Sequence, residues 1–119
     1  MSRALPWSGI TSKFKTLARP AAPVAAEESR LYYRRACLAA AEERFDVALI
    51  FCAKALELEP LDLATRLLVG KIHDRGLADV SAAVTAYRKV IALASYDPHD
   101  PYCSAAQAAL DQLVQAQSD

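Results

Sequence analysis

The side chains that could carry out chemistry are few in this sequence, and they lie far apart. The soft metal ligands are three cysteines and two histidines: Cys37, Cys52, Cys103, His73 and His99. They do not form the closely spaced double pairs that are typical of zinc sites, so we expect no metal site. We expect Cys37 and Cys52 to be small apolar residues between helices, which is the usual role of a buried free cysteine.

An imidazole and a carboxylate are adjacent at His73 and Asp74. Neighbouring side chains on a helix point about 100° apart, so these two do not converge on one substrate atom. No glycine-rich loop or nucleophile motif accompanies them. We therefore expect no enzyme and no cofactor, and we interpret His73 as groove lining or as a helix-end residue near Gly76.

The composition predicts one helical domain that is not drawn to nucleic acid. The chain has 119 residues, three glycines and 14 basic against 14 acidic residues, and its abundant Ala, Leu, Glu and Arg favour helix. Residues 1–26 carry four basic residues and no acid, whereas residues 27–119 are acidic overall. Within residues 27–119 the basic side chains are interspersed with acidic ones, so we expect no nucleic-acid partner.

The hydrophobic pattern predicts neither a membrane span nor a secretory signal. No apolar run approaches the roughly 20 residues that cross a bilayer. Three widely spaced cysteines do not fit a disulfide framework. We expect the cytoplasm or another reducing compartment, with the mitochondrial matrix as the alternative if the basic N-terminal region is a targeting segment.

One segment occurs twice in the sequence. Residues 48–58 (ALIFCAKALEL) are echoed 35 positions later by residues 83–93 (AVTAYRKVIAL). This offset is close to the roughly 34-residue period of helix-turn-helix repeats. The repetition predicts stacked antiparallel helix hairpins, which are typical of binding scaffolds.

Capping residues give the expected bounds of these elements. The first hairpin covers residues 27–60, with a turn at Arg44 and Phe45, an N-cap at Asp46 and an end at Pro60. The second covers residues 62–95 and the last helix residues 100–117. The residues expected to begin or end these helices are the N-caps Asp62, Asp79 and Asp100, Gly76 as a left-handed helix end, and Pro101 at the first position of the last helix.

These hairpins resemble the tetratricopeptide repeat family. Residues 43–48 (ERFDVA) and 54–60 (KALELEP) are similar to its inter-helix turn, second helix and closing proline. The residues that match family positions are Tyr32, Ala36, Ala48, Ala55 and Pro60 in the first repeat, and Gly70, Ala83 and Tyr87 in the second. The second repeat departs from the pattern by one extra residue in the turn and by Ser95 in place of the proline. The resemblance covers roughly residues 29–117 and implies a short right-handed superhelix of about five helices, with residues 100–117 as a capping helix.

The resemblance also implies a concave groove lined by the first helix of each hairpin. The residues placed near this groove are Arg30, Tyr33, Cys37, Leu67, Lys71 and Arg75. Such a basic and partly apolar surface suits an acidic or amphipathic protein segment. The alternative is that these charges are ordinary solvated helix surface. Since the chain has no asparagine, we do not expect the carboxylate-clamp form of the family.

The N-terminal arm offers a second contact. Residues 18–26 contain Pro20 and Pro23, which predict an extended linker after the arm. The residues of the arm that we expect to make this contact are Trp7, Ile10, Phe14 and Leu17, the last three on one helical stripe. Three interpretations stay open: an anchor that enters a partner's groove, a disordered tail, and an organelle transit peptide.

The expected function is a protein-protein interaction adaptor, or an accessory subunit that holds a larger complex together through its groove and arm. A chaperone that binds a client helix transiently is the alternative, and a small enzyme or metal protein is the third. Two repeats are fewer than such stacks usually need. A partner protein, the arm or a second copy of the chain would cover the remaining flank.

Overall fold

The computed structural model describes residues 21–118, so the predictions for the arm residues Trp7, Ile10, Phe14 and Leu17 lie outside the described part. The elements are α2 (Ala21–Ala41), α3 (Phe45–Leu58), α4 (Leu63–Lys71), the π-helical turn η1 (Ile72–Gly76), α5 (Val80–Leu93) and α6 (Pro101–Ser118). Within these residues there is no strand. The expected all-α class is confirmed.

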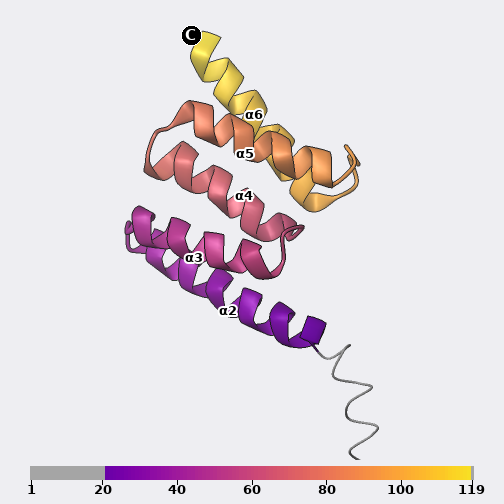
Figure 1. The fold of residues 1–119 in the computed structure, drawn as a ribbon. Coiled ribbons are helices and arrows are strands. Elements are labelled where there is room, and N and C mark those ends of the chain that lie inside the picture. The colour runs from indigo at the N-terminus through magenta and orange to yellow at the C-terminus, as the bar shows by residue number, and fades with distance from the viewer. Residues whose placement is uncertain (1–20, 119) are drawn as a thin grey trace, which may run out of the picture.

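The helices follow one another in chain order across the molecule (Figure 1). The first hairpin is formed by α2 and α3 and the second by α4 and α5, while α3 packs on α4 and α6 packs on α5. The ends of the described chain therefore lie at opposite ends of a stack (Figure 1). Antiparallel hairpins packed side by side are the predicted architecture.

Small residues bring the helices of the first hairpin together. Ala36 and Ala48 are completely buried, and Cys52 is buried beside them. Small side chains let helix axes approach closely, as the family resemblance implies for these positions. On another side of this contact, the rings of Tyr32 and Phe51 stack with their centroids 6.2 Å apart.

The second hairpin is built around one aromatic residue and one glycine. Tyr87 is completely buried in a cluster of α4, α5 and α6 residues, and its hydroxyl donates a 2.9 Å hydrogen bond to Asp74 Oδ2. A Cβ atom on Gly70 would lie 2.6 Å from the Tyr87 ring. Gly70 therefore fills the predicted small position because the Tyr87 ring lies directly against its backbone.

The start of the first helix differs from the prediction. Residues 21–26 belong to α2, whereas the sequence predicted an extended linker there and a helix start near residues 27–29. Pro23 is the third residue of this helix. The first-turn N–H groups have no acceptor inside the helix, so a proline in that turn costs no hydrogen bond. The expected extended conformation at residues 21–26 is wrong.

Three predicted N-caps are confirmed and a fourth is not. The side chains of Asp62, Asp79 and Asp100 accept hydrogen bonds from the backbone N–H groups of Ala64, Ala82 and Cys103, respectively. At the start of α3 the N-cap is instead Arg44, which makes no side-chain capping bond, and Asp46 lies inside the first turn. An acid in that turn still complements the helix dipole.

Gly76 does not adopt the predicted left-handed conformation. Among the described residues the positive φ angles belong to non-glycine residues, including Glu43 at 61° and Ala78 at 54°. Gly76 lies in η1, where a Cβ atom would be 2.6 Å from the Phe45 ring. Close packing between the two hairpins, and not backbone handedness, accounts for glycine at this position.

The extra residue of the second repeat lies in a helix. Three residues link α2 to α3 and three link η1 to α5, so the two connections are equally long. The surplus falls between Gly70 and Gly76, where the helix widens into η1 and Leu77 N–H donates to the Ile72 carbonyl. A π-helical turn holds one more residue than an α-helical turn and keeps the flanking faces in register.

Candidate partner-binding site

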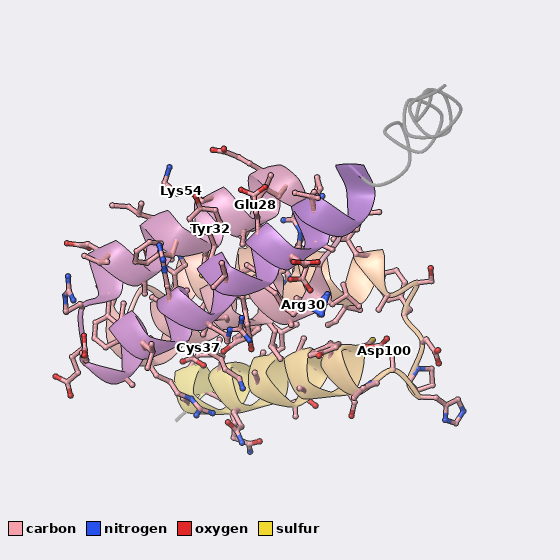
Figure 2. The ribbon with its side chains drawn as sticks, turned by 90° about the horizontal axis from the view of Figure 1, so that it is seen from below. Glu28, Arg30, Tyr32, Cys37, Lys54 and Asp100 are labelled. Carbon is pink, nitrogen blue, oxygen red and sulfur yellow. The ribbon has the colours of Figure 1, made fainter. Side chains whose placement is uncertain are left out.

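An open pocket of about 530 Å³ lies where α2, the α3–α4 turn and α6 meet. We call it the α2–α6 pocket. Its lining residues are Ala26, Ser29, Arg30, Tyr33, Glu59, Leu61, Asp62, Ala64 and Tyr102. Figure 2 shows Arg30 and Cys37 on the side of α2 that faces α6, and Tyr32 on the side that faces α3.

Two polar side chains of the pocket, Ser29 and Asp62, are hydrogen-bonded within the chain. Ser29 is buried, and its hydroxyl donates to the Ala55 carbonyl, which ties α2 to α3. The Asp62 carboxylate caps α4 and also accepts a 2.6 Å hydrogen bond from the Thr65 hydroxyl. These two side chains therefore shape the pocket and leave little bonding capacity for a ligand.

The exposed side chains of the pocket include an aromatic, an aliphatic and a cationic residue. Tyr102 and Leu61 are exposed large apolar residues, and Arg30 is exposed at the same pocket. Within residues 21–118 the recorded ion pair is that of Arg44 with Glu42, so Arg30 has no carboxylate partner there. A carboxylate of another protein could bind this guanidinium by two parallel hydrogen bonds.

Tyr33 of α2 lies close to Tyr102 of α6 and to Asp62 of the α3–α4 turn. Burial raises the pKa of Tyr33 from its ordinary 10.0 to about 12, and the neighbouring Cys37, Tyr102 and Asp62 side chains add to this effect. The phenol is therefore a neutral hydrogen-bonding group at physiological pH. Aromatic rings with one polar atom are the side chains that most often dominate protein interfaces.

The raised pKa of Tyr33 predicts a loss of stability in alkaline solution. Between pH 10 and about 12 an unfolded chain loses the phenolic proton while the folded chain keeps it, so the free energy of unfolding falls as pH rises. We expect this decline to be shallower in a Tyr33→Phe variant. Urea unfolding at pH values from 8 to about 11.5 measures it, and equal slopes in both proteins would contradict the assignment.

Only part of the expected groove set gathers in this pocket. Arg30 and Tyr33 line it, and Cys37 lies next to Tyr33. Leu67 is buried in the cluster with Tyr87, so it belongs to the core and cannot contact a ligand. Lys71 and Arg75 are exposed but do not line the pocket. The lining also contains Glu59 and Asp62, so its charge is mixed where the sequence predicted a basic surface.

Sequence reasoning missed Tyr102. Tyr102 directly follows Asp100 and Pro101, which begin the last helix, and the sequence predicted only a capping role for that helix. That helix packs on α5 and also contacts α4, so it extends the row of first helices formed by α2 and α4. The signal in the sequence that could have indicated Tyr102 as a contact residue is an aromatic side chain in the first turn of the last helix.

His73 and the buried Cys52 and Cys103 do not line the α2–α6 pocket. His73 lines a different hollow, between α3, α4 and α5. Burial raises the pKa of Cys52 to about 12, so this thiol stays protonated and packs as an apolar group. Within the described part of the chain, no three His, Cys, Asp or Glu side chains are grouped so as to hold a metal ion.

The fold defines the class of this protein as an all-α stack of helix hairpins with an open pocket beside its first helix. No protein-family model matches the chain, and no curated protein and no solved structure matches it. Among residues 21–118, no helix combines the length and the hydrophobicity that a membrane crossing requires.

Proposed function

We propose that this chain is a non-catalytic adaptor of the tetratricopeptide-repeat type, which binds a segment of another protein in the α2–α6 pocket. The observation that carries the proposal is the pocket itself. It joins two tyrosines, an exposed leucine and an arginine that has no ion-pair partner among residues 21–118, and these groups come from the first hairpin, the turn between the two hairpins and α6. Such a set provides apolar contact and one charged anchor, which recognition requires.

The mixed lining refines the partner's chemistry. Glu59 and Asp62 would repel a uniformly acidic segment, whereas Arg30 offers one anchoring position. The segment that fits is amphipathic, with large apolar side chains against Tyr33 and Tyr102 and a single carboxylate at Arg30. In this proposal the N-terminal arm, residues 1–20, adds a second contact to the same complex or to a neighbouring subunit.

Co-purification with a charge-reversed variant tests this function. A tagged wild-type chain should retain a partner protein from native extract in stoichiometric amount. Arg30→Glu would place a third carboxylate beside Glu59 and Asp62, and we expect at least about tenfold weaker retention. Arg35→Glu is the matched control, because it makes the same charge change on an exposed position of α2 outside the pocket. Equal loss in both variants, or no loss in either, would contradict the proposal.

A further inference from the structure

A second hollow of about 580 Å³ lies between α3, α4 and α5. We call it the α3–α5 groove, and it shares no lining residue with the α2–α6 pocket. Both hollows use α4, but on different sides. At about 100° per residue, Arg66, Val69 and His73 lie on the face of α4 turned away from Ala64, which lines the first pocket. The two hollows therefore open on opposite faces of the stack.

Apolar side chains form the floor of the α3–α5 groove, and those that come from α5 are short. Leu56 and Val69 form one wall, and small residues of α5 form the other. The α5 lining residues are Ala82, Thr85, Ala86, Arg88, Lys89 and Ala92, which recur at helical spacing. The core contacts of α5 are made by Ala83, Tyr87 and Val90 on another face. Because alanine side chains are short, the axis of another helix can approach α5 closely here.

The rim of the groove is positively charged, and no ion pair within residues 21–118 neutralises it. Arg66, Arg88 and Lys89 line it, and none of its lining residues is a carboxylate. The recorded ion pair of the described residues, Arg44 with Glu42, does not involve them. The Arg66 Nε atom donates to the Pro60 carbonyl at 2.8 Å, which fixes the guanidinium at the rim. The buried His73 Nδ1 atom also has no hydrogen-bond partner among residues 21–118.

The shape and the polar groups of this groove favour a helix as its occupant. From Ala82 to Ala92 the α5 wall rises by roughly 15 Å, which matches about three turns of a partner helix. The Thr85 hydroxyl already donates to the Ser81 carbonyl, and the α5 backbone is bonded within its own helix. An extended segment would find few partners for its backbone N–H and C=O groups there, whereas a helix satisfies its own.

We propose that the α3–α5 groove binds an amphipathic α-helix of a partner protein, with leucine-like residues on the alanine floor and Asp or Glu side chains at Arg66, Arg88 and Lys89. The chain's own N-terminal arm fits this groove poorly, because residues 1–20 contain four basic residues and no acid. This inference goes beyond the function proposed above. A second surface on the opposite face would let one small chain hold two polypeptides at once.

Binding of a designed helical peptide to the full-length chain tests the proposal. The probe is a fluorescein-labelled peptide of about 14 residues with leucines at i, i+3, i+4 and i+7 and glutamates elsewhere on its flanks. The reference peptide keeps the leucines and has lysine for each glutamate. Fluorescence anisotropy should show saturable binding of the acidic peptide, at least tenfold tighter than that of the basic one, and weakening with added salt. Equal affinity for both peptides, or no saturation, would overturn the proposal.

Variants locate the binding to the groove. Lys89→Glu and Ala86→Trp should each raise the Kd of the acidic peptide at least tenfold, the first by charge and the second by filling the floor. Lys54→Glu is the control, since Lys54 is exposed on α3 and lines neither hollow. Arg30→Glu should leave peptide binding unchanged, which separates this proposal from the function of the α2–α6 pocket. An unchanged Kd for Lys89→Glu would overturn it, as would a dimer of the wild-type chain in light scattering that Lys89→Glu dissociates.

Discussion

Replacing Tyr87 by alanine is expected to lower the free energy of unfolding by about 3 to 5 kcal/mol. Tyr87 is the largest completely buried side chain among the described residues, and it lies between α4, α5 and α6. Its removal leaves a cavity, because Gly70 provides no side chain to fill the space. A domain of this size has a total stability on the order of 5 to 15 kcal/mol, so the variant should lose a large fraction of it.

Two milder variants separate the parts of this effect. Tyr87→Phe keeps the ring and removes the hydrogen bond to Asp74, so we expect a loss of about 1 kcal/mol. Gly70→Ala should destabilise the wild-type chain, since the new Cβ atom would be 2.6 Å from the Tyr87 ring. In a Tyr87→Leu background, which removes the ring edge, the same Gly70→Ala change should cost less. Urea unfolding measures the free energy of unfolding of each variant and of the wild type. Additive effects of Gly70→Ala and Tyr87→Leu would contradict the contact.

The second large effect concerns the two tyrosines of the α2–α6 pocket. If this pocket binds the partner, Tyr102→Ala and Tyr33→Ala should each weaken the complex by about 2 kcal/mol, which is roughly a 30-fold rise in Kd. Both rings border the pocket, and their removal would take away most of its aromatic surface. Interface tyrosines in partly enclosed pockets are frequent sites of such losses.

Calorimetry with the partner recovered by co-purification measures these affinities. Leu38→Ala is the matched control, because Leu38 is an exposed apolar residue of α2 that lines neither the pocket nor the groove. Tyr33 is half-buried, so its variant is compared only after its unfolding midpoint has been measured. A change of less than twofold for Tyr102→Ala would place the partner elsewhere on the molecule.

The fold could be predicted from local signals in the sequence, each of which acts on residues only a few positions away. The aspartates at positions 62, 79 and 100 are N-caps as expected, since a carboxylate directly before a helix usually accepts a hydrogen bond from a first-turn N–H group. Alanine and glycine positions marked where helices touch. Glycine 76 misled the prediction because a close approach to Phe45 and a left-handed turn both require glycine, and only the packed structure tells them apart.

Fewer residues of the candidate site could be predicted from the sequence, because the α2–α6 pocket depends on how α2, the α3–α4 turn and α6 pack together. Arg30 and Tyr33 were found on the face of α2 that the repeat pattern implies. Leu67 was misplaced, since helical spacing alone does not say which of several apolar residues on α4 is covered by α5 and α6. Tyr102 and Leu61 were missed, because they come from the cap and the inter-repeat turn, whose positions no repeat pattern specifies.

Site-specific photocrosslinking in native extract tests the central claim most directly. A photoreactive phenylalanine analogue replaces Tyr102 in the α2–α6 pocket or, in a second protein, Ile50, which is 56% exposed on α3 and lines neither this pocket nor the α3–α5 groove. The account predicts a defined protein adduct from position 102 and little or none from position 50. Adducts of equal yield from both positions, or none from position 102, would contradict it.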